Sequence, residues 1–290
     1  MDDAFRRDGN ESSVRNGPHP VKIAPKRRLP DALIIGVKKG GTRTLLTFLQ
    51  KHPQIVANSD ELHFFDKDAN FSKGLEWYRK QMPAARPDQV ILEKTPIYFP
   101  SLAAPERIYD SIPNVKLILI VRDPIVRLVS DYLHEKIHYR KTWSLEEAVT
   151  NTAQNGSLAV IENRNILKLS LYDEAYSRYM KFFKPEQMLI LSGEKFIRDP
   201  WVELEKVQSF LGVRQAIRKE NFYFNPEKQF MCMRSTGVNG FCMGDNKGRK
   251  HPKVAQKVYQ VLKEYFTPSV NRFALLSQSS FCNEWLHGEV

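Results

Sequence analysis

A short run of cations and glycines, Lys38-Lys39-Gly40-Gly41-Thr42, stands between an apolar run and a helical pattern. Glycines let backbone N–H groups turn inward, and the following helix points its positive end at the same place. The Thr42 hydroxyl can add a hydrogen-bond donor, and Lys39 a mobile charge. A glycine-rich turn alone is weak evidence, but strand, turn and helix together predict a phosphate-binding site.

This turn has the glycine spacing of the nucleotide P-loop but not its following residues. Thr42-Arg43 stands where that loop has Lys-Ser/Thr. A nucleoside triphosphatase also needs a carboxylate for magnesium at the end of an apolar strand. The apolar run over residues 117–121 leads instead into Arg122, which suits a bare phosphate better than a metal. A P-loop kinase or NTPase is therefore a remote alternative.

Two carboxylates and an imidazole, on Glu61, His63 and Asp66, lie close together in the chain. A hydroxyl is a poor nucleophile, so an enzyme that uses one needs a base to take its proton. Glu61 could be that base, and so could His63, because the ordinary pKa of imidazole lies near neutrality. The alternative is an amphipathic loop in which Phe64 and Phe65 fill the core and the polar side chains are merely solvated.

Apolar runs that alternate with helical patterns must position these residues. We expect buried strands over residues 33–37, 55–56, 90–92, 117–121 and 188–191. We expect helices after the glycines and near residues 74–82, 124–138, 145–153, 170–183, 200–211 and 252–266. This alternation predicts one α/β domain over residues 30–290, with a central parallel sheet flanked by helices. Residues 1–29 are polar and are expected to form a flexible arm.

The chain is strongly basic: 44 Lys and Arg against 33 Asp and Glu give a net charge of +11 over 290 residues. The partner or substrate is therefore expected to be polyanionic, which leaves nucleic acid, acidic membrane and sulfated polysaccharide open. The longest apolar run is far shorter than the ~20 residues that span a bilayer. We expect no membrane span and no signal peptide in this sequence.

Three cysteines, Cys232, Cys242 and Cys282, are too few for a disulfide scaffold and wrongly spaced for zinc. Spacing alone leaves two possibilities, one Cys232–Cys242 bridge or three reduced thiols. Glycosylation sequons begin at Asn10, Asn70 and Asn155 and lean weakly toward the secretory pathway.

The order of these motifs resembles the PAPS-dependent sulfotransferases, and within them the heparan sulfate glucosamine 3-O-sulfotransferases. The resemblance covers about residues 30 to 287 and rests on ordered blocks: Lys38-Lys39-Gly40-Gly41-Thr42-Arg43, Glu61-Leu62-His63-Phe64-Phe65-Asp66, Glu93-Lys94-Thr95-Pro96, Arg122-Asp123-Pro124 with Arg127, Ser130-Asp131-Tyr132, Asn221-Phe222-Tyr223-Phe224-Asn225 and Lys247-Gly248-Arg249. It implies sulfuryl transfer from 3′-phosphoadenosine 5′-phosphosulfate to a glucosamine 3-hydroxyl of heparan sulfate, with no obligatory metal.

The resemblance assigns three groups of residues to the sulfate donor. Those at the 5′-phosphosulfate are Lys39, Gly40, Gly41, Thr42 and Arg43, with Lys39 stabilising charge on the leaving phosphate. Arg122 and Ser130 correspond to the pair that grips the 3′-phosphate. Lys247, Gly248 and Arg249 match a later loop that closes over the same nucleotide end.

On the acceptor side, the resemblance makes Glu61 the general base, while His63 and Asp66 orient the base and the sugar. Lys94 adds a cation at the reacting centre, and Lys38 is expected to contact substrate. The acceptor cleft is also expected to contain His134, where the family often has glutamine, and the basic side chains of Arg127, Arg140, Lys141 and Arg164. Small residues at Ser59 and Gly244, where some relatives carry glutamate and histidine, suggest a more open cleft and a broader acceptor range.

The resemblance also implies a Cys232–Cys242 disulfide, and hence an oxidising compartment: the Golgi lumen or the cell exterior. The expected protein is a glycoprotein whose partner is a heparan sulfate or heparin oligosaccharide rather than nucleic acid. Alternatives are a sulfotransferase for another hydroxyl or glycan, and a non-enzymatic heparin- or nucleic-acid-binding module. The module explains the charge but not Glu61 beside the nucleotide blocks.

Overall fold

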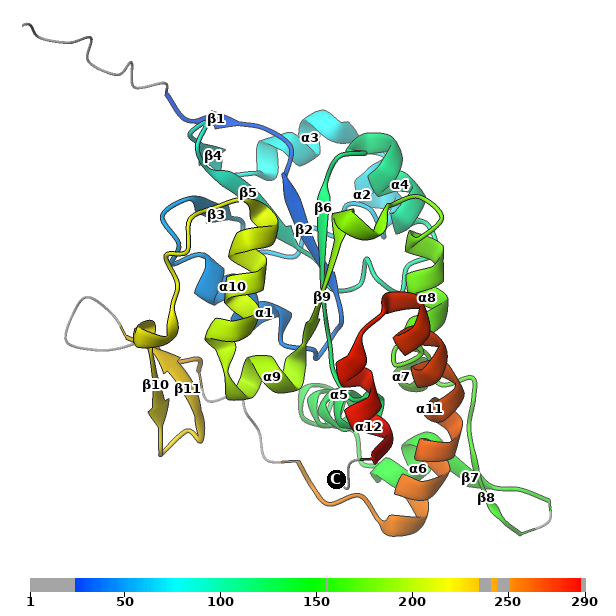
Figure 1. Ribbon diagram of the computed structural model, residues 1–290. Helices are drawn as coiled ribbons and strands as arrows, with labels where there is room; N and C mark the ends of the chain where they lie inside the picture. The colour runs from blue at the N-terminus through cyan, green and yellow to red at the C-terminus, as the bar shows by residue number, and fades with distance from the viewer. Residues whose placement is uncertain (1–23, 155, 235–240, 245–250, 288–290) are drawn as a thin grey trace, which may run out of the picture.

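Five parallel strands form the central sheet, in the order β3-β5-β2-β6-β9 (Figure 1). The computed structural model describes residues 24–154, 156–234, 241–244 and 251–287. The strands are β2 (Ala32–Gly36), β3 (Ile55–Ala57), β5 (Val90–Lys94), β6 (Lys116–Val121) and β9 (Met188–Ser192). Every neighbouring pair is parallel, with Leu33 opposite both Glu93 and Leu117. The predicted strands and the predicted fold class are confirmed.

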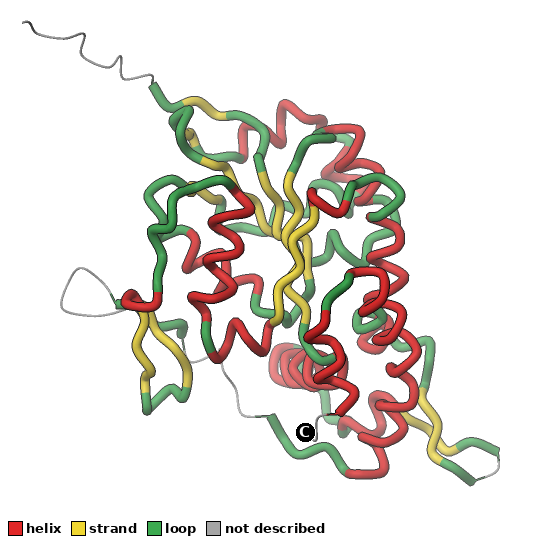
Figure 2. The backbone as a smooth tube through the Cα atoms, viewed as in Figure 1, coloured by secondary structure: helices red, strands yellow, loops and turns green. Residues whose placement is uncertain are grey.

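Both faces of the sheet are buried because helices cover each of them (Figures 1 and 2). Along β2, Leu33 and Ile35 pack into one apolar cluster, whereas Ala32 and Ile34 pack into the other. The second cluster contains buried side chains of α1 (Thr42–Leu49), α9 (Gly193–Arg198) and α10 (Pro200–Leu211). The first contains those of α3 (Gly74–Gln81), α4 (Ala104–Ser111), α5 (Pro124–His138), α8 (Tyr172–Tyr179) and α11 (Gln256–Ser277).

Shorter elements complete the described chain. The helices are α2 (Asp68–Phe71), α6 (Leu145–Val149), α7 (Asn165–Lys168) and α12 (Asn283–His287). Three small antiparallel pairs join β1 (Lys26–Arg27) to β4 (Ala84–Ala85), β7 (Thr150–Thr152) to β8 (Leu158–Val160), and β10 (Phe222–Asn225) to β11 (Phe230–Met233). Within the described residues, no helix combines the length and the apolar character that crossing a membrane requires.

The structure corrects several predicted boundaries. The helix expected over 145–153 ends at Val149, and the residues that follow form β7, since Val149 and Thr150 are β-branched and favour a strand. The helix expected over 252–266 begins at Gln256 and continues through Pro268, because Phe273 beyond the proline is buried in the core. The helix expected over 170–183 is shortened to α8.

The boundary of the predicted arm also moves. Residues 24–29 belong to the described structure, and β1 within them pairs with β4. The rest of the predicted arm, residues 1–23, lies outside the described residues. Because the five strands are parallel, their carboxyl ends meet at one edge of the sheet, where polar residues of different strands can converge.

Candidate active site

The glycine turn (residues 37–41) joins β2 to α1 and packs directly onto β6. The Val37 N–H donates to the Ile120 carbonyl at 2.9 Å, and a Cβ on Gly40 would collide with that carbonyl oxygen. Gly41 has φ of 112° and Lys39 has φ of 72°, in the left-handed region. The turn therefore presents its backbone to the start of α1, where an anion is stabilised.

Lys38 points to a buried charge cluster on α5. Its Nζ lies 2.9 Å from Asp131 Oδ1, and Arg127 Nη1 lies 3.0 Å from Asp131 Oδ2. Although burial acts to raise it, the pKa of Asp131 is lowered by the Arg127 and Lys38 charges. This ion-paired cluster ties the glycine turn to α5.

Arg127 does not line the expected acceptor cleft. Its side chain is 0% exposed, and its Nε and Nη2 donate to Ser170 Oγ and to the Ile166 carbonyl, both at 2.5 Å. The guanidinium holds α5 against α7 from inside the core. The exposed side chains of Arg140, Lys141 and Arg164 remain compatible with the predicted role in the cleft.

Arg122 directly follows β6, and Ser130 lies half-buried on α5. Arg122 Nε lies 3.6 Å from Glu194 Oε1, but this buried nitrogen has no hydrogen-bond partner among the described residues. Between them, Asp123 caps α5 by accepting from the Ile125 and Val126 N–H groups. Burial raises the pKa of Asp123 to about 6. Arg122 is thus held just before α5, and its Nε–H group can still donate a hydrogen bond.

The acceptor loop (residues 61–66) brings the predicted acid-base residues together at the carboxyl end of β5. The Glu61 carboxylate, 33% exposed, is paired with the fully buried Lys94 ammonium. Glu61 Oε2 lies 3.8 Å from His63 Nε2, and His63 Nδ1 lies 2.9 Å from Asp66 Oδ2. Burial lowers the pKa of Lys94, although Glu61 acts in the opposite direction. Carboxylate, imidazole and second carboxylate form one connected array.

The same loop also fills part of the core, as the alternative interpretation expected, but its polar side chains are paired with one another and with Lys94 rather than merely solvated. Phe64 and Phe65 are buried, and the Phe64 ring stacks on Tyr78 with centroids 4.4 Å apart. His63 adopts φ of 49°, which is uncommon for a residue other than glycine. The buried aromatic pair anchors the loop beneath its polar side chains.

Glu93, next to Lys94, is a buried residue to which sequence reasoning gave no role. It accepts from Thr95 Oγ1 at 2.6 Å and from the Tyr78 hydroxyl at 3.3 Å. Burial raises the pKa of Glu93 to about 7, while the hydrogen bonds lower it. The sequence feature that could have indicated a role for Glu93 is its position directly after the apolar residues of β5.

His134 lies beside the glycine turn. Burial, together with the Lys39 and Lys38 charges, lowers the pKa of its imidazole. Its ring stacks on His138, one turn further along α5, with centroids 5.5 Å apart and planes 8° from parallel. His134 therefore remains a candidate for substrate contact.

The predicted loop of Lys247, Gly248 and Arg249 lies outside the described residues. Shortly after it, His251 has its pKa lowered by burial and by the charges of Arg122 and Lys39. The chain therefore returns to the vicinity of Arg122 and the glycine turn at this point.

The remaining predicted residues take defined places. Arg43 Nη1 donates to the Ser59 carbonyl at 2.7 Å, so its guanidinium bridges α1 and the segment leading into the acceptor loop. Thr42 is buried at the first position of α1. The predicted Cys232–Cys242 disulfide is present, and Cys282 is a buried free thiol.

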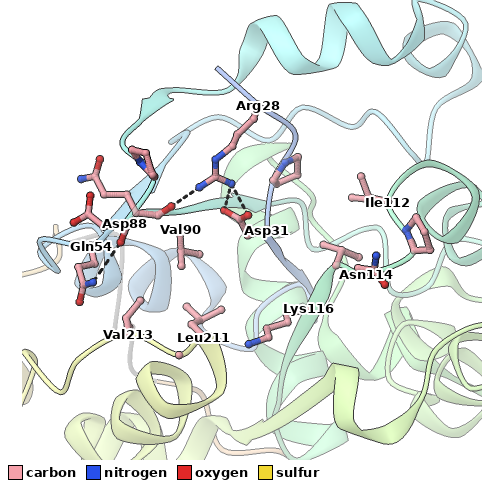
Figure 3. A pocket seen from close by; sticks show the side chains of 16 residues that line it. Arg28, Asp31, Gln54, Asp88, Val90, Ile112, Asn114, Lys116, Leu211 and Val213 are labelled. Atoms are coloured by element: carbon pink, nitrogen blue, oxygen red, sulfur yellow. Dashed lines mark hydrogen bonds and ion pairs between the residues drawn. The ribbon is translucent and has the colours of Figure 1, made fainter. Parts of the chain in front are cut away.

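A pocket of 590 Å³ lies away from these residues, at the amino ends of the strands (Figure 3). Asp31, Val90 and Lys116 line it, and its charged groups pair within the protein: Arg28 with Asp31, and Lys116 Nζ with the Phe210 carbonyl at 2.6 Å. None of the predicted site residues lines it. Among the described residues, no group of three or more His, Cys, Asp or Glu side chains could hold a metal ion.

Comparisons with known proteins agree on one family. A family model described as "Sulfotransferase domain" matches residues 29–287. The chain is 39% identical over 273 residues to heparan sulfate glucosamine 3-O-sulfotransferase 5 of Mus musculus, covering 92% of this chain and 76% of that protein. It is 38% identical over 265 residues to heparan sulfate glucosamine 3-O-sulfotransferase 6 of Homo sapiens, covering 90% of this chain and 76% of that protein.

Solved structures share the fold. A sulfotransferase from Alicyclobacillus acidocaldarius matches with a TM-score of 0.68 at 21% identity, over 89% of this chain and 99% of that one. A mouse sulfotransferase in complex with PAP matches with a TM-score of 0.51 at 13% identity, over 89% of each chain.

Proposed function

The chain belongs to the sulfotransferase domain family and, within it, to the heparan sulfate glucosamine 3-O-sulfotransferases, and from this premise we propose its reaction. It transfers a sulfuryl group from 3′-phosphoadenosine 5′-phosphosulfate to the 3-hydroxyl of glucosamine in heparan sulfate. The observation that carries this proposal is the Glu61 carboxylate, which is paired with Lys94 and faces His63 at the carboxyl edge of the sheet. The P-loop kinase alternative is set aside by the family match.

Two features of the site fit a donor with phosphate at both ends. The glycine turn leads directly into α1, whose first N–H groups can bind a phosphate, and no side chain projects from Gly40 or Gly41 beside them. Arg122 Nε is buried without a hydrogen-bond partner in the described chain, as expected for a group that awaits an anion. We assign Lys39, Gly40, Gly41, Thr42 and Arg43 to the 5′ end, Arg122 and Ser130 to the 3′-phosphate, and Lys247, Gly248 and Arg249 to the closing loop.

Glu61 acts as the general base in this proposal. The bound donor supplies a sulfuryl group whose leaving group is a stable phosphate. Glu61 accepts the proton of the 3-hydroxyl as the new oxygen–sulfur bond forms and the bond from sulfur to the 5′-phosphate breaks. Lys39 stabilises the charge on the departing phosphate, so no metal is needed for this step. Lys94 directs the carboxylate by its ion pair, and His63 with Asp66 orients the base and the sugar.

The acceptor is a polyanion, in keeping with the net charge of +11. Lys38 and His134 lie at the glycine turn and on α5, and we assign both to acceptor contacts, together with Lys94. The small side chains at Ser59 and Gly244 support a broad acceptor range. A heparan sulfate or heparin chain is therefore proposed as the partner, and not nucleic acid.

The enzyme is proposed to act in the Golgi lumen or outside the cell. The Cys232–Cys242 disulfide is of a kind that persists in oxidising compartments, and it supports this location.

Incubation with labelled donor and a panel of defined heparan sulfate oligosaccharides, followed by mapping of the product, tests the reaction. We expect label at the glucosamine 3-hydroxyl, without added metal. Label at the 6-hydroxyl or at the amino nitrogen would overturn the proposed acceptor position, and transfer only to another glycan would overturn the proposed acceptor. A non-enzymatic heparin-binding module would bind the oligosaccharide without transferring label.

A further inference from the structure

The backbone of the acceptor loop is held by a single short stretch of chain, the anchoring segment (residues 93–98). The Leu62 backbone lies close enough to the Glu93 carboxylate to help lower its pKa. The next N–H, of His63, points to Thr95 Oγ1 at 3.5 Å, and the N–H of Phe64 donates to the Tyr98 hydroxyl at 3.1 Å. Two consecutive N–H groups of the loop are thus directed at side-chain hydroxyls of the anchoring segment.

These side chains are themselves fixed. Glu93, Thr95 and Tyr98 are all 0% exposed. Thr95 donates to Glu93 at 2.6 Å, so the hydroxyl that faces the His63 N–H is itself fixed by a buried carboxylate. Tyr78 adds a hydrogen bond of 3.3 Å to the other oxygen of Glu93. A buried, mutually bonded network of this kind has little freedom to shift.

The anchoring segment is also tied to the strand that leads into the glycine turn. The Thr95 N–H donates to the Ile34 carbonyl at 3.2 Å, and just beyond the segment the Phe99 N–H donates to the Ile35 carbonyl at 2.9 Å. Both carbonyls belong to β2. One piece of chain therefore sets the relative position of the phosphate-binding turn and the acceptor loop.

The backbone conformation of the acceptor loop itself requires support from its surroundings. His63 has a positive φ, which costs energy for a residue with a side chain and persists where the surroundings impose it. On the opposite side of the loop, Asn70 Nδ2 donates to the carbonyls of Leu62 and His63, both at 3.1 Å. The carbonyls of Leu62 and His63 are therefore both bound, while the His63 N–H faces Thr95.

We propose that Glu93, Thr95 and Tyr98 are positioning residues, which hold the backbone of residues 62–64 so that the Glu61 carboxylate meets the acceptor hydroxyl. This inference rests on the proposed role of Glu61. Lys94, between Glu93 and Thr95 in the same segment, directs the Glu61 side chain by its ion pair. The segment thus controls both the loop backbone and the base, and transfer depends on hydroxyl groups that touch neither substrate.

Removal of single hydroxyl groups tests this inference. Thr95→Val keeps the shape of the side chain and removes both hydrogen bonds, and Tyr98→Phe removes the acceptor for the Phe64 N–H. Since misplacement by about 1 Å can cost 10²-fold, we expect each variant to lower kcat by roughly 10- to 100-fold. The KM for heparan sulfate and the Kd for 3′-phosphoadenosine 5′-phosphate, measured by calorimetry, should change little, because neither hydroxyl binds a ligand.

Two controls separate positioning from packing. Thr95→Ser restores the hydroxyl and should recover most of kcat. Thr150→Val removes a similarly buried hydroxyl, one bonded to the Glu146 carbonyl at 2.9 Å on the hairpin beyond α6, and should leave kcat unchanged. Melting curves establish that each variant is folded; should Thr95→Val not fold, Tyr98→Phe decides the matter alone.

A folded Tyr98→Phe variant with wild-type kcat, or a Thr95→Ser variant as impaired as Thr95→Val, would overturn the inference. Glu61→Gln is measured in the same series. If Glu61→Gln is fully active, the proposed base is wrong, irrespective of Thr95 and Tyr98. If Glu61→Gln is inactive and both hydroxyl variants are fully active, Glu61 remains the proposed base and the positioning role of Thr95 and Tyr98 is wrong.

Discussion

The Glu61 carboxylate is paired with the Lys94 ammonium, whose side chain is completely buried at the carboxyl end of β5. A cation in that position fixes where one oxygen of the carboxylate lies. The other oxygen lies 3.8 Å from His63 Nε2, and the Glu61 side chain as a whole is 33% exposed. This geometry leaves one carboxylate oxygen available to an incoming hydroxyl.

Glu61→Gln should abolish transfer while preserving the site. The amide has the shape of the carboxylate but cannot take a proton, so we expect kcat to fall by about 10²–10⁴-fold, the usual contribution of a general base. Binding of 3′-phosphoadenosine 5′-phosphate, followed by calorimetry, should persist. Asp60→Asn changes the neighbouring, exposed carboxylate and serves as the matched control with near-normal transfer. An active Glu61→Gln enzyme would move the base to His63 or to water.

Arg127→Met should destabilise the fold rather than weaken acceptor binding. The substitution leaves the buried Asp131 carboxylate with Lys38 as its remaining cation, and it deprives the Ile166 carbonyl and Ser170 of their donor. Breaking a buried ion pair costs about 3–5 kcal/mol. Chemical denaturation measures that loss, and Arg164→Met, at an exposed position, should be close to neutral. Equal stability of both variants would contradict the buried role of Arg127.

His52 should make the fold sensitive to acid. Its Nδ1 accepts from the Gln54 N–H at 3.0 Å, and its Nε2 lies 2.8 Å from the Arg214 carbonyl, which suits a neutral ring. Burial lowers the pKa of His52 below its usual 6.5 in the folded state. The unfolded chain therefore takes up the proton first, and the stabilisation is lost as the pH falls below about 6.5.

The melting temperature as a function of pH tests this expectation. His52→Asn keeps an acceptor for the Gln54 N–H and does not titrate. Its melting temperature should therefore fall less than that of the wild type between about pH 7 and pH 5, the range in which histidine titrates. Parallel curves for the two proteins would show that His52 does not contribute.

Asn70 heads a glycosylation sequon, yet its side-chain amide is bonded to the Leu62 and His63 carbonyls. A glycan would replace one of the two amide hydrogens that make these bonds. We expect Asn70 to be unmodified in active enzyme from a glycosylating host, as read by mass spectrometry of the peptide. Full glycan occupancy at Asn70 in a fully active preparation would disprove this. The sequons at Asn10 and Asn155 lie outside the described residues.

Local patterns in the sequence predicted the sheet well. In the run Leu117–Val121 every side chain is buried. A short, continuous apolar run of this kind between helical segments is typical of a parallel strand that helices cover on both faces. The order of the motifs likewise indicated Glu61 and Lys94, and the structure pairs them. The continuation of α11 past residue 266 and through Pro268 was missed, because packing of Phe273 outweighs the local cost of proline in a helix.

Long-range partners account for what the sequence did not reveal. Arg127 has the spacing of a surface charge, and its burial depends on Ser170 and Ile166, far along the chain. Glu93 and Lys94 are adjacent in the sequence. Only the fold shows that Lys94 faces the Glu61 side chain, while Glu93 is bonded to Thr95 and Tyr78. A single sequence contains the residue types but not these contacts.

A crystal structure with 3′-phosphoadenosine 5′-phosphate and a heparan sulfate oligosaccharide would test the central claim most directly. We expect the 5′-phosphate on the glycine turn, the 3′-phosphate at Arg122, and a glucosamine 3-hydroxyl at about 2.6–3.2 Å from Glu61. A nucleotide bound elsewhere, or a different hydroxyl facing that carboxylate, would contradict the account.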